Sequence, residues 1–140
     1  MALAGFAGFL DATYLTARHY SGAALQCGLV TGCEEVTTSR YATLFGIPIA
    51  LPGSLYYLAL FFLTLAWFDG RSGWPMKVLP SLTVAGFGVS LYLVYLQLWV
   101  LEAICQYCML SAALCTVLFI SGMVLYRLTR QDVLLSRLFG

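Results

Sequence analysis

The sequence predicts an all-α integral membrane protein, a bundle of four transmembrane helices with an external loop that carries a short amphipathic surface helix. Three observations support this fold. Of the 140 residues, 61% are hydrophobic and only 9% are charged, whereas charged residues make up about 25% of a typical soluble domain. The chain contains four apolar segments, each near the length of about 20 residues that a membrane-spanning helix needs. The connections between them are short, so residues 1–140 are expected to form a single membrane domain.

The first span is expected at residues 2–19. Asp11 interrupts its apolar run and no Lys or Arg precedes that residue, which differs from the basic start of a signal peptide, so we expect the segment to be retained. Residues 20–47 are rich in Gly, Ser, Thr and Glu and are interpreted as an external loop. Within it, Tyr41, Leu44 and Phe45 recur at helical spacing, which predicts a surface helix over residues 39–45.

The remaining spans are expected at residues 48–68, 78–100 and 104–126. The run from Val78 to Tyr126 has Glu102 as its only formal charge. As one helix it would measure about 73 Å, more than twice the hydrocarbon thickness of about 30 Å. It must therefore turn back, and the polar residues from Glu102 to Cys108 are the best place for the turn.

Sidedness follows from the number of spans. The external loop at residues 20–47 and the turn near Cys108 are separated by two spans, so they face the same side. The opposite side holds the connection 69–77 and the tail 127–140, and it collects most of the basic residues, namely Arg71, Lys77, Arg127, Arg130 and Arg137. The positive-inside rule makes that side and both termini cytoplasmic. The cysteines then face the compartment in which disulfides persist.

Two closely spaced cysteine pairs are the candidate reactive groups. Cys105 and Cys108 form a Cys-x-x-Cys motif, a dithiol that can close and reopen a disulfide. Cys27 and Cys33 flank a short loop with two glycines, and a bridge there would contribute only about 2 kcal/mol of stability in the chain-entropy model. Thiol exchange is therefore a better use for the loop pair, and we predict that the two pairs relay two electrons.

A lipid-soluble acceptor is expected to receive these electrons. The sequence has no nucleotide-binding glycine motif and no haem-attachment motif. Ser111, Ala112 and Cys115 follow Cys108 along one helix stripe, and the small side chains could leave space for a flat ring. The net charge of +1 indicates no basic face of the kind that nucleic-acid binding requires.

The chain resembles the vitamin K epoxide reductase family, in a stand-alone prokaryotic form without a fused thioredoxin-like domain. The resemblance covers essentially the whole chain. It rests on an ordered set of features, namely the loop cysteines Cys27 and Cys33, Ser39 six residues later, Phe45-Gly46-Ile47-Pro48 before span two, and Cys105-Gln106-Tyr107-Cys108 opening span four. It implies a four-helix bundle around a quinone, with a short surface helix that caps the site.

The resemblance also implies an activity, that of a thiol:quinone oxidoreductase in the bacterial inner membrane. Cys27 would exchange with a periplasmic dithiol protein of thioredoxin fold, and Cys33 would exchange with Cys105. Cys108 would face a quinone of ubiquinone or menaquinone type, with Ser39 aiding its reactivity. The quinone would lie near Cys108, Ser111 and Ala112. Vertebrate members carry a tyrosine at the position of Ala112, so epoxide reduction is not expected here.

Two other interpretations are open from the residues. The four cysteines could bind a structural zinc ion or form inert disulfides in a non-enzymatic four-span protein, although an oxidising compartment favours exchange. The other four-helix disulfide-oxidase family carries its Cys-x-x-Cys in the first external loop, the reverse of the order found here. Cys115 is expected to be a small buried hydrophobe. Asp11 fits either a polar pathway or a local cap, and His19 is expected to be an interfacial anchor.

Overall fold

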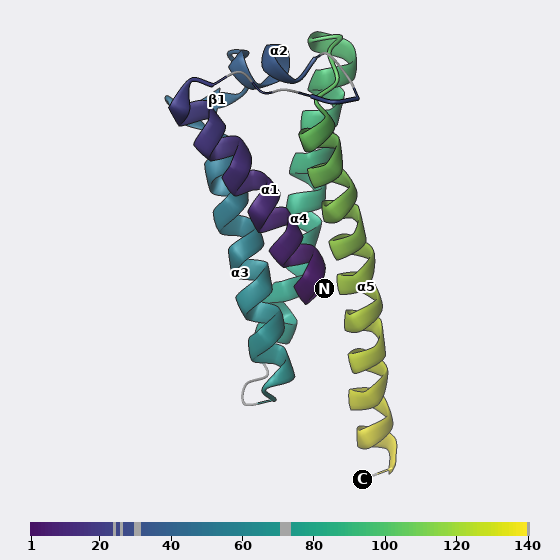
Figure 1. The fold of residues 1–140 in the computed structure, drawn as a ribbon. Coiled ribbons are helices and arrows are strands. Elements are labelled where there is room, and N and C mark those ends of the chain that lie inside the picture. Colours follow the sequence, from purple (N-terminus) through teal and green to yellow (C-terminus); the bar gives the residue numbers. More distant parts are fainter. Residues whose placement is uncertain (24, 26, 30–31, 71–73, 140) are drawn as a thin grey trace.

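The computed structural model is mostly helical and describes residues 1–23, 25, 27–29, 32–70 and 74–139. The long helices in these residues are α1 (Ala2–Ser21), α3 (Ala50–Phe68), α4 (Pro75–Tyr95) and α5 (Gln106–Phe139). They run alongside one another as an elongated bundle (Figure 1). A shorter helix, α2 (Cys33–Thr38), and a two-stranded hairpin lie over one end of the bundle, where α4 turns into α5.

Three helical segments in the described residues are long and apolar enough to cross a membrane, namely Ala50–Phe68, Lys77–Val100 and Gln106–Phe139. The chain is therefore a membrane protein. Helix α1 does not belong to this group, because Asp11, Arg18 and His19 make it less apolar than α3. The predicted membrane class is confirmed, whereas the count of four spans stays a prediction.

Helix α1 nevertheless packs closely into the bundle, against α3 and α5. Its buried face presents Gly5, Gly8 and Ala12 at helical spacing. The ring of Tyr57 on α3 lies against Gly8 so closely that a Cβ at this position would overlap the ring. Small residues therefore let α1 approach α3, as they do in many membrane helix pairs.

The long apolar run turns back between Val100 and Gln106, which overlaps the segment from Glu102 to Cys108 that the sequence predicts. Helix α4 continues as a π-helical turn, η1 (Leu96–Val100), and Glu102 then adopts a positive φ of 49°. π-Helical turns inside helices often mark functional positions. The turn brings the backbone of Cys105 to the end of the bundle, directly ahead of α5.

The surface helix predicted at residues 39–45 is wrong. The short helix of the loop is α2, and the hairpin is formed by β1 (Thr43–Leu44) and β2 (Ile47–Pro48), with Leu44 paired to Ile47. Phe45 and Gly46 between them have φ values of 53° and 82°. A two-residue turn with both φ values positive matches the twist of a β-hairpin. The turn therefore overrides the helical spacing of the apolar side chains.

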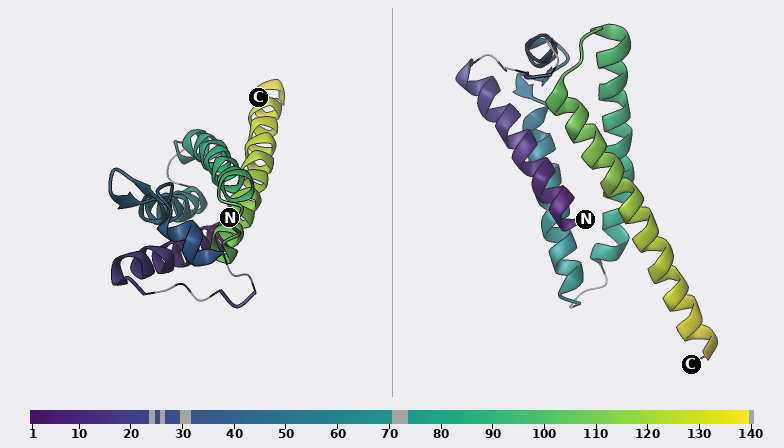
Figure 2. Two further views of the ribbon diagram at one scale, coloured as in Figure 1. Left: turned by 90° about the horizontal axis from the view of Figure 1, so that it is seen from above. Right: turned by 45° about the vertical axis from the view of Figure 1, so that its right-hand side comes forward.

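The end predicted for the fourth span at residue 126 is not a helix end. Helix α5 continues through the tail to Phe139 as one helix of 34 residues, or about 51 Å at 1.5 Å per residue. No Gly or Pro follows Gly122 before the last residue, so no residue that commonly ends a helix interrupts this stretch. Both Figure 1 and the right-hand view of Figure 2 show α5 extending beyond α3 and α4.

Candidate redox centre

The two cysteine pairs meet in one cluster at the loop end of the bundle. Cys33 and Cys105 belong to its buried core, with 1% and 0% of their surface exposed, and Cys27 and Cys108 pack against that core. The other buried members are apolar, namely Leu15, Leu25, Val36 and Ala103. The cluster thus combines the start of α2 with the start of α5.

The two cysteine pairs differ in their bonding. Cys27 and Cys33 form a disulfide with Cα atoms 6.1 Å apart, a separation within the usual range for disulfides. Cys105 and Cys108 are free thiols. The structure thus contains one bonded and one unbonded pair of cysteines.

Cys105 occupies the N-cap position of α5. Its carbonyl oxygen accepts the N–H of Met109 at 3.0 Å, and its Sγ accepts the N–H of Cys108 at 3.4 Å. Cys105 lies just outside the candidate span, and its pKa is lowered to about 7. The main cause is a hydrogen bond with the Cys108 thiol, helped by the backbone N–H groups of Tyr107 and Cys108 and opposed by burial and by the charge of Asp11. The lowered pKa favours the thiolate, which is the reactive form of cysteine.

The loop pair is docked directly on the motif. The side-chain Oε1 of Gln106 accepts the N–H of Leu29, between the two loop cysteines, at 3.3 Å. Gly32 packs against the backbone of Ile104, where a Cβ would lie 2.7 Å from N and 2.9 Å from O. These two residues immediately precede Cys33 and Cys105, so the glycine determines how closely the two cysteine-bearing segments approach.

Gln97 holds the other side of the motif. This residue of η1 is only 3% exposed, and its Oε1 accepts the N–H of Cys105 at 3.0 Å. Its backbone carbonyl accepts the N–H of Ala103 at 3.1 Å. One residue therefore fixes both the turn before α5 and the backbone of Cys105.

A cavity of about 400 Å³ opens beside the motif. Its wall comes from α1, α2, the hairpin, α3, α4, η1 and α5, and most of its surface is apolar. The candidate residues that line it are Ser39, Cys108, Ser111, Ala112 and Cys115, whereas Cys27, Cys33 and Cys105 do not. The volume lies within the range of about 300–1,000 Å³ that is typical of ligand pockets.

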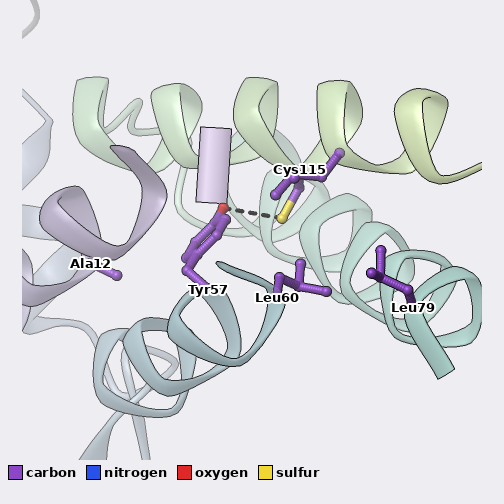
Figure 3. Packing of buried hydrophobic residues seen from close by; sticks show 6 residues of the cluster. Ala12, Tyr57, Leu60, Leu79 and Cys115 are labelled. Carbon is purple, nitrogen blue, oxygen red and sulfur yellow. Dashed lines mark hydrogen bonds between the residues drawn. The ribbon is translucent and has the colours of Figure 1, made fainter. Parts of the chain in front are cut away.

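Tyr57 crosses from α3 to α5 at the side of this cavity. Its hydroxyl lies 2.8 Å from the Ser111 carbonyl oxygen, 2.8 Å from Ser111 Oγ and 3.1 Å from Cys115 Sγ. Figure 3 shows the hydroxyl pointing at the Cys115 sulfur. Cys115 itself is 7% exposed and belongs to the buried core of the bundle. It is therefore a core residue that also accepts or donates one hydrogen bond.

Two polar residues of α1 lie close to this centre. Asp11 is 8% exposed, and its Oδ2 has no hydrogen-bond partner among the described residues. His19 lines the cavity near the loop end. Ser39 also lines the cavity, and its hydroxyl donates to the Val36 carbonyl at 2.8 Å.

Sequence reasoning missed three residues that shape this centre, Gly32, Tyr57 and Gln97. Gln97 carried a usable signal, because it is a polar side chain inside the long apolar run, and such residues usually have a function or a specific partner. Tyr57 is one of many aromatic residues at helical spacing, and Gly32 is one of two glycines between the loop cysteines. Their roles depend on contacts across the bundle, which the sequence does not display.

Among the residues that the structure describes, no three His, Cys, Asp or Glu side chains are grouped so that they could hold a metal ion.

The family model described as "Vitamin K epoxide reductase family" matches residues 1–123 of the chain. The matched region contains both cysteine pairs, the turn with Gln97 and the part of α5 that lines the cavity.

Proposed function

Because the chain belongs to the vitamin K epoxide reductase family, whose members are disulfide-forming oxidoreductases of membranes, we propose that it is a thiol:quinone oxidoreductase. It takes electrons from an extracytoplasmic protein of thioredoxin fold and passes them through Cys27 and Cys33 to Cys105 and Cys108, and then to a membrane quinone. One observation carries this proposal. The loop disulfide and the motif dithiol share a buried cluster, and of these four described cysteines Cys108 is the one that lines the cavity.

Exposure supports the first step of the relay. Cys27 is partly exposed whereas Cys33 is buried, so a thiolate of a protein partner can reach Cys27 first. Its attack forms a mixed disulfide at Cys27 and releases the thiolate of Cys33. The second thiolate of the partner then breaks the mixed disulfide. The partner leaves with a new disulfide, and the loop pair holds two electrons.

The second exchange runs between Cys33 and Cys105. Cys33 attacks the Cys105 sulfur of an oxidised motif and Cys108 leaves as thiolate. Cys27 then attacks Cys33, which closes the loop disulfide and releases Cys105. The lowered pKa of Cys105 supports the last of these steps, because a thiol of low pKa is a good leaving group. The products are the loop disulfide and the motif dithiol, which are the forms described above.

A quinone beside Cys108 supplies an acceptor for two electrons, and the residues present fit such a group. The cavity wall is mainly apolar, and the small side chains of Ser111 and Ala112 leave room along the Cys108 side of α5. The protein excludes water from this space and holds Cys108 at its edge. As the disulfide between Cys105 and Cys108 re-forms, two electrons and two protons leave the pair.

The proposed topology has α1 as the fourth span. At about 1.5 Å per residue its 20 residues cover about 30 Å, and the helix packs along α3 and α5. The cysteine end would then be extracytoplasmic and both termini cytoplasmic, in the inner membrane. The basic residues Lys77, Arg127, Arg130 and Arg137 support this orientation, and Arg71 lies outside the described residues. Helix α2 would cap the quinone site.

Quinone reduction by the purified protein tests the proposal. With dithiothreitol as donor, Cys105→Ala and Cys108→Ala should each lose turnover, because neither can re-form the motif disulfide. Cys27→Ala should keep a weak reaction with dithiothreitol but fail to oxidise a reduced thioredoxin-fold protein. Ser136→Ala on the exposed end of α5 is the matched surface control. Full turnover by the Cys108→Ala protein would contradict the assignment.

A further inference from the structure

Gln97 is a buried amide with one end free. Its side chain is 3% exposed and lies on the wall of the cavity. The backbone N–H of Cys105 can only donate, so the amide end that it contacts at 3.0 Å is the oxygen. The NH2 end has no hydrogen-bond partner among the described residues. Because Gln97 lines the cavity, an occupant of the cavity can supply the acceptor that this donor lacks.

Several other hydroxyl groups of the cavity wall already make hydrogen bonds. Those of Ser39, Thr37 and Tyr56 donate to backbone carbonyls at 2.8, 2.8 and 3.1 Å. Tyr57 is hydrogen-bonded to Ser111 and Cys115. His19 and Tyr41 also line the cavity, but both are more exposed than Gln97. Gln97 is thus the deeply buried donor of the described wall that remains available.

We propose that the NH2 group of Gln97 donates a hydrogen bond to a carbonyl oxygen of the quinone and holds that oxygen beside Cys108. This inference rests on the proposed function. The Cys105 N–H fixes the other end of the amide, so the donor is oriented before the quinone binds. Gln97 therefore links the quinone site to the backbone of the motif that reduces it.

The role of the hydrogen bond follows from the charge that develops during reduction. A disulfide forms between Cys105 and Cys108, two S–H bonds are lost, and two electrons and two protons pass to the quinone, which becomes a quinol. Negative charge builds on the quinone oxygen as the electrons arrive, and an oriented donor stabilises that charge more than it stabilises the neutral carbonyl. Gln97 supplies neither the electrons nor the protons.

Two substitutions separate this role from a structural one. Gln97→Glu keeps the shape and the oxygen that accepts the Cys105 N–H, but an ionised carboxylate cannot donate and repels a charged oxygen. Gln97→Met keeps the approximate length of the side chain. It removes both the oxygen that accepts the Cys105 N–H and the NH2 donor. For menadione and decylubiquinone as probes, we expect Gln97→Glu to raise KM at least about 10-fold, with a loss of turnover that grows as pH rises. Gln131→Glu on the exposed end of α5 makes the same exchange as a control.

The hydrogen bond from Gln97 can be detected by infrared spectroscopy of the quinone carbonyl groups. Menadione labelled with 13C at its carbonyl groups should show a lowered C=O stretching frequency when bound to the wild-type protein. The shift should shrink in both Gln97 variants. Reduction of the motif disulfide by dithiothreitol should keep its wild-type rate in the Gln131→Glu control, whose new charge lies on the exposed end of α5.

The results of these experiments test the role of Gln97 separately from the proposed function of the protein. An unchanged carbonyl frequency together with an unchanged quinone KM in Gln97→Glu overturns the inference about Gln97. If Gln97→Met does not fold, the result for the isosteric Gln97→Glu variant decides the question. If neither variant folds, an unshifted carbonyl band of menadione bound to the wild-type protein overturns the inference about Gln97. Normal turnover by Cys108→Ala instead removes the proposed function.

Discussion

The contact between Gly32 and Ile104 provides a sharp test of electron transfer between the two pairs. In Gly32→Ala the new Cβ would lie 2.7 Å from the Ile104 nitrogen, 2.9 Å from its oxygen and 3.1 Å from the Ala103 Cβ. Carbon atoms in favourable contact are about 3.5–4.0 Å apart. The two backbone segments must therefore separate by roughly 1 Å, and no flexible side-chain end can absorb the shift, because the nearest atoms are backbone atoms.

That separation acts directly on Cys33 and Cys105, the next residue in each segment. A misplacement of about 1 Å can lower the rate of a reaction between positioned groups about 100-fold. We expect the oxidation of a reduced thioredoxin-fold protein, coupled to quinone, to fall by about 10- to 100-fold in Gly32→Ala. The weaker reaction with dithiothreitol, which does not need transfer between the pairs, should fall much less.

Rapid mixing with acid quenching and thiol alkylation would locate the blocked step. In Gly32→Ala the loop pair should be reduced at a normal rate while the motif pair stays oxidised. Gly28→Ala is the matched control, because this glycine of the same loop has no atom within 4 Å of an added Cβ. Wild-type turnover of the protein substrate by Gly32→Ala would refute this reasoning.

Two further predictions concern α1. The pKa of Cys105 is lowered mainly by the other thiol of the motif, and the charge of Asp11 works against this. Asp11→Asn should therefore move the midpoint of Cys105 ionisation below about 7, so that thiolate persists to lower pH; an unchanged midpoint of thiolate absorbance at 240 nm would contradict it. Gly8→Ala should destabilise the bundle by about 1–3 kcal/mol, because its methyl group overlaps the Tyr57 ring. Thermal unfolding followed with a thiol-reactive dye measures this, and Gly88→Ala, with open space around the glycine, should unfold like the wild type.

The sequence predicted those structural features that depend on residues close together in the chain. The turn between α4 and α5 follows from the length of the apolar run and from Glu102. The hairpin was missed because it depends on Phe45 adopting a positive φ, which is uncommon for a bulky residue. The continuation of α5 beyond residue 126 was missed because a change from apolar to mixed composition is not itself a signal that ends a helix.

The sequence by itself determined the membrane class, the two cysteine pairs and the family, because composition, spacing and motif order are properties of the chain alone. The family resemblance is confirmed by the match over residues 1–123. Only the tertiary structure decided which groups meet. It brings the loop disulfide onto the start of α5 through Gly32, and it turns the amide of Gln97 between Cys105 and the cavity. These contacts join residues on different elements, and their distances depend on how the helices pack.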